Sequence, residues 1–101
     1  MMKEITAQEL KQLIDGQVDF QLIDVREPHE FDEANLNGIL IPMGEAIERA
    51  NEISKDKQVV VHCRSGKRSA TVINALESQF GYTNLYNLKG GILAYIDEIG
   101  L

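Results

Sequence analysis

Apolar residues along the chain follow two spacings, which predict short strands separated by amphipathic helices. Short apolar runs, typical of strands that are buried on both faces, occupy residues 20–25, 38–41, 59–61 and 85–88. Apolar residues recur three and four positions apart after Thr6, over 28–36, over 43–53, after the Cys63 loop and after Gly91. Thr6 and Glu9 form a capping box that begins the first helix, and Gly81 ends the helix that follows Cys63.

This alternation of strands and helices predicts an α/β fold, a three-layer domain with a central, mainly parallel sheet flanked by helices. No repeat, low-complexity run or linker interrupts the pattern, so we expect one domain over residues 1–101. Ligands of such sheets bind beyond the carboxyl ends of the strands. The turn from Asp24 to Arg26 and the loop at Cys63 both follow predicted strands, and we expect them to line one crevice.

Composition and charge exclude several classes of function. The chain carries 16 acidic and 10 basic residues and a net charge of −6, whereas nucleic-acid binding requires a broad basic face. The N-terminus lacks the apolar stretch of a signal peptide, and we expect no membrane partner. A single cysteine cannot form an internal disulfide, which favours a reducing compartment, and we expect the cytoplasm.

Against this acidic background, one loop concentrates positive charge around the cysteine. It reads Cys63-Arg64-Ser65-Gly66-Lys67-Arg68-Ser69 and joins a predicted strand to a predicted helix. The first N–H groups of a helix lack intrahelical partners and carry the positive end of the helix dipole. Gly66 allows a tight turn that points N–H groups inward. We therefore expect Cys63 to ionise readily and to hold an anion against its sulfur.

The other side chains of the loop divide into three expected roles. Arg64 and Lys67 can neutralise a dianionic substrate. Arg68 is better placed to brace the loop. Ser65 and Ser69 can donate hydrogen bonds to the sulfur or cap the helix.

Structural interpretations compete with catalytic ones at several positions. Cys63 could be a buried core cysteine, but its polar and cationic neighbours favour a reactive thiol. His62 could be a base, yet it precedes Cys63 on a strand and should point to the opposite side, so a packed histidine is preferred. Asp24, Arg26 and Glu30 are best interpreted as a cap and an ion pair that hold the loops.

Four segments, in this order, resemble the single-domain rhodaneses, a family of small sulfurtransferases. They are Asp24-Val25-Arg26 with Glu30-Phe31, then residues 38–42, then residues 63–68, then Leu88-Lys89-Gly90-Gly91. The resemblance implies a rhodanese-like fold in which Cys63 accepts a sulfur atom as a persulfide. It further implies that amides of residues 64–68 bind the persulfide and that Arg64 and Lys67 select the donor.

The same resemblance implies that Asp24, Arg26, Glu30 and Arg68 support the loop, and we expect Ser69 to support it as well. The expected partners are a small anionic sulfur donor such as thiosulfate, a thiophilic acceptor and, as a further candidate, a sulfur-relay protein. We expect neither a cofactor nor a metal ion.

Two alternatives remain. A phosphatase or arsenate reductase of related fold has one more residue between cysteine and arginine, whereas only four residues separate Cys63 from Arg68 here. A non-catalytic rhodanese-like module would bind a protein partner, but such modules often lack the cysteine.

Overall fold

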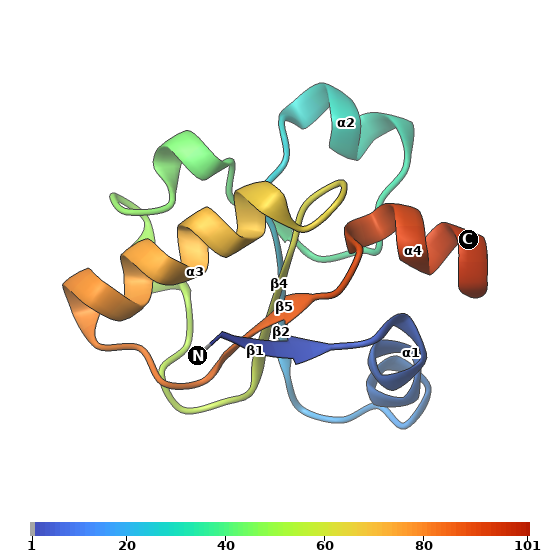
Figure 1. Cartoon of the computed structure of the whole chain (residues 1–101), viewed down its shortest axis with the longest axis horizontal. Helices are drawn as coiled ribbons and strands as arrows, with labels where there is room; N and C mark the ends of the chain where they lie inside the picture. The colour runs from blue at the N-terminus through green and yellow to red at the C-terminus, as the bar shows by residue number, and fades with distance from the viewer. Residues whose placement is uncertain (1) are drawn as a thin grey trace.

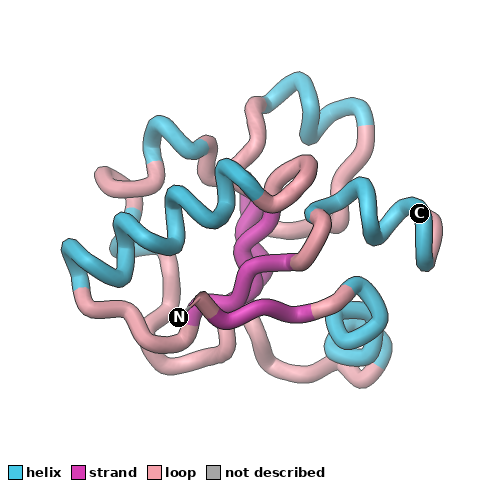
Figure 2. Tube along the Cα trace, in the orientation of Figure 1, coloured by secondary structure: helices cyan, strands magenta, loops and turns pink. Residues whose placement is uncertain are grey.

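A parallel five-stranded sheet forms the centre of the computed structural model, which describes residues 2–101 (Figures 1 and 2). In spatial order the strands are β1 (Lys3–Ile5), β5 (Leu85–Leu88), β4 (Val59–His62), β2 (Gln21–Asp24) and β3 (Ile39–Leu40). All four neighbouring pairs are parallel, so the carboxyl ends of the strands share one edge. The predicted α/β fold with a parallel sheet is therefore confirmed.

Helices cover both faces of the sheet and complete the three layers. On one face lie α1 (Ala7–Asp15) and α4 (Gly91–Glu98), and on the other lies α3 (Lys67–Phe80), beside two short 3₁₀ turns (Figure 1). The short helix α2 (Pro28–Glu33) stands at the carboxyl end of the sheet.

Strand β4 shows why the apolar runs form central strands. Val59 and Val61 are fully buried against the α3 side, whereas Val60 is fully buried with Leu10 and Ile92 on the α1 and α4 side. Successive side chains of a strand point to opposite faces, so a strand covered on both sides needs apolar residues at every position.

Helix boundaries follow the predicted capping signals at two places. The N–H of Glu9 donates to the hydroxyl of Thr6 at 3.1 Å, and the N–H of Thr6 donates to the Glu9 carboxylate at 2.9 Å. Gly81 ends α3 in the left-handed conformation, with φ of 69°. The interpretation of these residues as caps is confirmed.

The prediction of a helix over residues 43–53 is wrong. This segment forms two 3₁₀ turns, Met43–Glu45 and Ala50–Glu52, joined by a hydrogen-bonded turn over residues 46–49. Its Ala46, Ala50 and Ile53 do face the core, which explains the helical spacing. The carbonyls of Ala50 and Ile53, however, accept hydrogen bonds from the buried Tyr82 hydroxyl at 2.6 and 2.9 Å. The contact with Tyr82 thus holds the end of a segment that forms 3₁₀ turns instead of an α-helix.

Two further expectations require correction. The helix predicted over 28–36 ends at Glu33, because Ala34 adopts an extended conformation and its carbonyl accepts a hydrogen bond from Arg26. Strand β1 was not predicted at all. It is an edge strand of three residues with one buried side chain, Ile5, and so lacks an apolar pattern of its own.

Candidate active site

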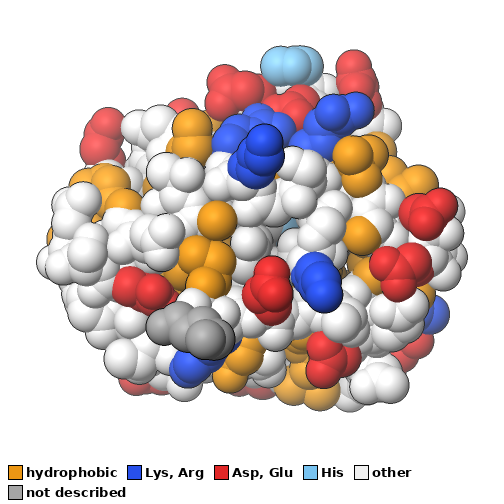
Figure 3. Space-filling model, in the orientation of Figure 1, with side chains coloured by type: hydrophobic (Ala, Val, Ile, Leu, Met, Phe, Trp, Pro, Cys, Tyr) orange, Lys and Arg blue, Asp and Glu red, His pale blue; other side chains and the backbone are white. Residues whose placement is uncertain are grey.

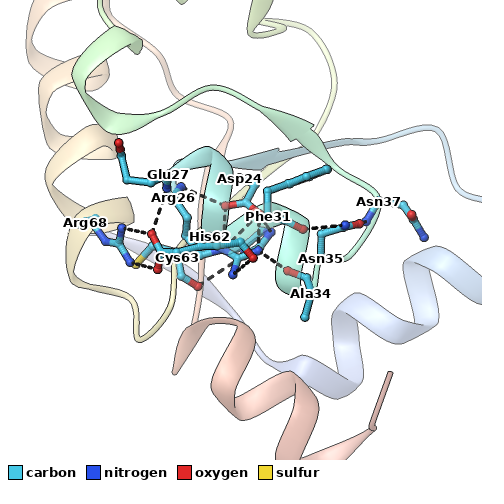
Figure 4. Close-up of polar contacts among 11 residues, drawn as sticks. Asp24, Arg26, Glu27, Phe31, Ala34, Asn35, Asn37, His62, Cys63 and Arg68 are labelled. Carbon is cyan, nitrogen blue, oxygen red and sulfur yellow. Dashed lines mark hydrogen bonds and ion pairs between the residues drawn. The ribbon is translucent and has the colours of Figure 1, made fainter.

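The two segments expected to share a crevice are neighbours in the sheet. Strands β2 and β4 pair directly, with Asp24 in register with His62, so Arg26 and Cys63 follow adjacent strand ends (Figure 4). The expected proximity of the two turns is therefore confirmed.

Cys63 lies beneath the turn that begins α3. Its side chain is buried, and the N–H of Gly66 donates to Sγ at 3.1 Å. Gly66 has φ of +107°, a left-handed conformation that side-chain-bearing residues rarely adopt. This conformation folds the chain back over the sulfur directly before Lys67, the first residue of the 14-residue helix.

Hydrogen bonding lowers the pKa of the Cys63 thiol below its ordinary value. Burial by itself raises this pKa, since it disfavours the thiolate. The Ser69 hydroxyl and the N–H groups of Ser69, Gly66 and Ser65 act in the opposite direction and outweigh burial. The loop therefore stabilises an anionic sulfur mainly through directed N–H and O–H groups.

The beginning of α4 holds the outer side of the same loop. The N–H groups of Ile92 and Leu93 donate to the carbonyls of Cys63 and Arg64 at 2.9 and 3.1 Å. In a trans peptide the C=O and N–H point in opposite directions, so these bonds turn the N–H groups of Arg64 and Ser65 away from α4. Gly91 permits the approach, because a Cβ there would lie 2.3 Å from the Arg64 carbonyl oxygen.

Arg68 joins the start of α3 to α2. Its guanidinium donates to both carboxylate oxygens of Glu30, at 2.7 and 2.9 Å. The hydrogen bond from Arg68 is the main reason that the pKa of Glu30 falls to about 2. Arg68 thus makes the kind of contact expected of a residue that braces the loop.

A buried ion pair fixes the end of β2. Arg26 donates through Nε to Asp24 Oδ1 at 3.0 Å and through Nη2 to Oδ2 at 2.8 Å. The same guanidinium donates to the carbonyls of Ala34 and Glu30 at 2.8 and 3.3 Å. The pair therefore ties the α2 segment to the sheet.

His62 packs inside the fold. Its ring is fully buried, with Nδ1 3.4 Å from the Cys63 carbonyl oxygen and Nε2 3.7 Å from Asp24 Oδ2. Burial lowers the pKa of His62, which favours the neutral ring. The ring faces Asp24, in agreement with the packed interpretation.

The remaining loop side chains differ in exposure. Arg64, Ser65 and Lys67 are exposed at the mouth of the loop, whereas Ser69 is buried with its hydroxyl 3.4 Å from Sγ. Two serines were expected near the sulfur. Only Ser69 contacts Sγ with its hydroxyl, whereas the Ser65 side chain is exposed. Figure 3 shows cationic side chains gathered near the N-terminal end of α3, bordered by acidic residues.

Comparison with known proteins identifies the family. A model of the Rhodanese-like domain matches residues 6–98. The chain belongs to the rhodanese-like family. It is 38 % identical over 98 residues to the putative sulfurtransferase YtwF of Bacillus subtilis, a match that spans 96 % of this chain and 93 % of that protein. A sulfurtransferase of Allochromatium vinosum is 38 % identical over 96 residues, which span 94 % and 89 %.

One solved structure and one further relative extend this comparison. The rhodanese-like domain protein of Staphylococcus aureus superposes with a TM-score of 0.85 at 34 % identity, covering 97 % of this chain and 95 % of that chain. The putative sulfur carrier protein YrkF of Bacillus subtilis is 32 % identical over 90 residues. That match spans 88 % of this chain and 48 % of YrkF.

Two residues of this rhodanese-like site were missed by sequence reasoning. The Gly90-Gly91 pair is recognisable as a helix entry, but the contact of Gly91 with the Cys63 loop depends on how α4 packs. Asn87 lies within β5, where the sequence indicates only a strand, yet its amide bonds to Ser69 and to Gly66. Its one signal is a polar residue in a buried strand.

Proposed function

We propose that this rhodanese-like protein transfers a sulfane sulfur from an anionic donor such as thiosulfate to a thiophilic acceptor through a persulfide on Cys63. One observation carries the proposal: the chain's single thiol lies under inward-facing N–H groups at the start of a helix, with its pKa lowered. The matching family and the sulfurtransferase names of two relatives support it.

In the first step, the Cys63 thiolate attacks the outer sulfur of thiosulfate. A bond forms between Sγ and that sulfur, while the sulfur–sulfur bond of thiosulfate breaks and its electron pair leaves with sulfite. In the second step, an acceptor such as cyanide attacks the outer sulfur of the persulfide. The electron pair of the breaking bond returns to Sγ, thiocyanate departs and the thiolate is restored.

The loop supplies the binding groups in this proposal. Backbone N–H groups of residues 64–68 would bind the persulfide anion, and the exposed Arg64 and Lys67 would attract the donor. Arg68 would act indirectly, through Glu30, by fixing the position of the loop. The groups that stabilise the anion are then fixed before the donor arrives.

Loop length favours sulfur over a tetrahedral oxyanion. Only four residues lie between Cys63 and Arg68. A persulfide adds a single atom above Sγ, whereas a phosphoryl group brings three equatorial oxygens that each need donors at about 2.7–3.1 Å. A loop of this length therefore favours a persulfide sulfur over a phosphoryl group.

The cellular donor or acceptor in our proposal is a sulfur-relay protein. The name of YrkF as a putative sulfur carrier supports this part of the proposal. We place the reaction in the reducing cytoplasm, where a single reactive thiol remains available. Among residues 2–101, no helix is both long and apolar enough to cross a membrane.

Mass spectrometry of the intact protein tests the reaction directly. Thiosulfate should add the mass of one sulfur atom to the parent protein, and cyanide should remove it with release of thiocyanate. Cys63→Ser should show neither change, whereas Ser78→Ala, a control at an exposed position of α3 outside the loop, should show both.

Full turnover by Cys63→Ser would exclude the proposal. So would ready hydrolysis of an aryl phosphate that depends on Cys63, an outcome that favours the phosphatase alternative.

A further inference from the structure

The Ser69 hydroxyl lies between two groups that compete for its proton. Its Oγ is 2.6 Å from Oδ1 of Asn87 and 3.4 Å from Sγ of Cys63. A hydroxyl has one proton to donate. Ser69 is fully buried and Asn87 is 5 % exposed, so bulk water does not replace either partner easily.

The orientation of the Asn87 amide follows from its second contact. Nδ2 of Asn87 donates to the carbonyl of Gly66 at 3.1 Å. A carbonyl oxygen can only accept, so the amino group must face Gly66 and the amide oxygen must face Ser69. The short contact between Ser69 and Asn87 therefore uses the hydroxyl proton of Ser69.

This arrangement suits a sulfur that carries no charge. With its proton directed to Asn87, the Ser69 oxygen can accept a hydrogen bond from the Cys63 S–H group but cannot donate to Sγ. A thiolate needs the opposite arrangement, in which the hydroxyl turns toward Sγ. In a persulfide the charge resides on the outer sulfur, and Sγ is again uncharged.

We propose that Asn87 is a positioning residue for sulfur transfer. In the thiol and persulfide states it accepts the hydrogen bond of the Ser69 hydroxyl, and in the thiolate state that hydroxyl donates to Sγ instead. The persulfide part of this inference rests on the proposed function. The change of state requires a rotation of the Ser69 hydroxyl and a small separation of its oxygen from Asn87 Oδ1, because two acceptor oxygens repel at 2.6 Å without a proton between them. No covalent bond is made or broken.

The location of Asn87 supports this role. It lies in β5, the neighbour of β4, and pairs in register with Val61, two residues before Cys63. A buried asparagine in a strand is costly unless its amide is hydrogen-bonded. Both ends of this amide bond to the segment that surrounds the sulfur, one to Gly66 and one to Ser69.

Other ionisable groups around Cys63 also affect thiolate formation. Substitution of Ser69 or Asn87 leaves all of these groups in place. On the loop and α3 these are Arg64, Lys67 and Arg68, and on α2 it is Glu30, which is bound to Arg68. From the strands, Asp24 is bound to Arg26, and burial lowers the pKa of His62.

A double-mutant cycle on the intact protein tests the inference. Thiolate formation at Cys63 is followed by ultraviolet absorbance against pH in the parent, Asn87→Leu, Ser69→Ala and the double variant. Leucine keeps the branched shape of asparagine but cannot accept or donate a hydrogen bond. Circular dichroism and thermal unfolding establish that each variant folds, and Asn87→Ala replaces Asn87→Leu if the leucine does not fit.

Asn87→Leu should lower the midpoint of thiolate formation by about 0.5 to 1 pH unit, because Ser69 then donates to sulfur without competition. Ser69→Ala should raise the midpoint by a similar amount. In the presence of Ser69→Ala, the leucine substitution should have no further effect. An equal effect with and without Ser69→Ala would mean that Asn87 acts only through Gly66 and would overturn the inference, as would an unchanged or raised midpoint in Asn87→Leu.

Single-turnover kinetics provides a second measurement. At a pH above both midpoints, where Cys63 is fully ionised in either protein, Asn87→Leu should slow persulfide formation from thiosulfate, because its thiolate is more stable and less nucleophilic. The same substitution should speed discharge of the persulfide to cyanide, because the more stable thiolate is the better leaving group. The pH titration needs neither donor nor acceptor. A failure of the proposed function would therefore appear as absence of the persulfide, and a failure of this inference as loss of the dependence on Ser69.

Discussion

Individual residues at the Cys63 loop have separable tasks. Buried polar groups such as Ser69 act on the sulfur through hydrogen bonds, whereas Arg64 and Lys67 are exposed and act, in our proposal, at longer range. Exposed charges are screened over about 8 Å at physiological ionic strength, while short buried hydrogen bonds are affected much less. Salt therefore distinguishes donor attraction from sulfur stabilisation.

At this scale we predict a salt-dependent effect of Lys67→Ala. The thiosulfate KM should rise about two- to fivefold at low ionic strength, and the difference from the parent should shrink as salt is added. Steady-state kinetics across a salt titration measures both. Lys57→Ala is the matched control, because it removes the same charge from a position two residues before β4. Lys57 lies at the amino ends of the strands, whereas the Cys63 loop follows their carboxyl ends. Identical salt profiles for the parent and Lys67→Ala would contradict a role in attracting the donor.

At the scale of elements, two helix N-termini meet at the loop from opposite sides. Helix α3 begins directly after Gly66, whose N–H contacts the sulfur. Helix α4 uses its first N–H groups to bind the carbonyls of Cys63 and Arg64. The first N–H groups of a helix have no partners within the helix. Here the turn that begins α3 faces the sulfur, whereas the first N–H groups of α4 bind the loop carbonyls. The shape of the loop thus depends on packing between elements distant in sequence.

Gly91→Ala should disrupt this contact and lower sulfur transfer at least tenfold per folded molecule. The new Cβ would lie 2.3 Å from the Arg64 carbonyl oxygen, so α4 and the loop must separate. Gly81→Ala is the control: Gly81 has a similar φ of +69° but nothing within 4 Å of the added Cβ. Both variants should lose about 1–2 kcal/mol of stability from left-handed strain, yet Gly81→Ala should retain transfer. Full transfer by folded Gly91→Ala would show that α4 does not shape the site.

At the scale of the whole molecule, two ion pairs connect the sheet, α2 and α3. Arg26 binds Asp24 and two carbonyls of the α2 segment, and Glu30 on α2 binds Arg68 on α3. Site and fold are therefore linked, because the contacts that position the loop also join separate layers. Their loss should be visible in global unfolding.

The depressed pKa of Glu30 predicts how stability depends on pH. The folded pKa is about 2, below the ordinary value of 4.5, so the Glu30–Arg68 pair stabilises the fold fully above the unfolded pKa. This contribution is lost as pH falls through the folded pKa. Glu30→Gln should reduce the free energy of unfolding by about 1–3 kcal/mol near neutral pH. The difference from the parent should shrink between about pH 5 and about pH 2.

Urea unfolding at several pH values measures this difference. Glu9→Gln is a suitable control, because Glu9 also has a lowered pKa but is exposed and bonds only locally to Thr6. A constant difference between Glu30→Gln and the parent over the whole pH range would show that ionisation of Glu30 does not contribute.

The sequence by itself determined the parallel α/β fold, the capping of α1 and α3 and the position of Cys63 between β4 and α3. These features depend on local rules: apolar residues at every position of a doubly covered strand, a capping box, and a glycine in the left-handed conformation. The neighbouring position of the Asp24 turn also followed, since the carboxyl ends of parallel strands share one edge.

Only the tertiary structure decided features that require partners distant in sequence. Residues 43–53 have helical spacing, but the Tyr82 hydroxyl binds two of their carbonyls and an α-helix does not form. Strand β1 exists because β5 pairs with it. Gly91 and Asn87 reach the Cys63 loop from α4 and β5, and no local pattern records contacts of this kind. The sequence placed the thiol and the N–H groups of its own loop, whereas tertiary packing brought Gly91 and Asn87 to that loop.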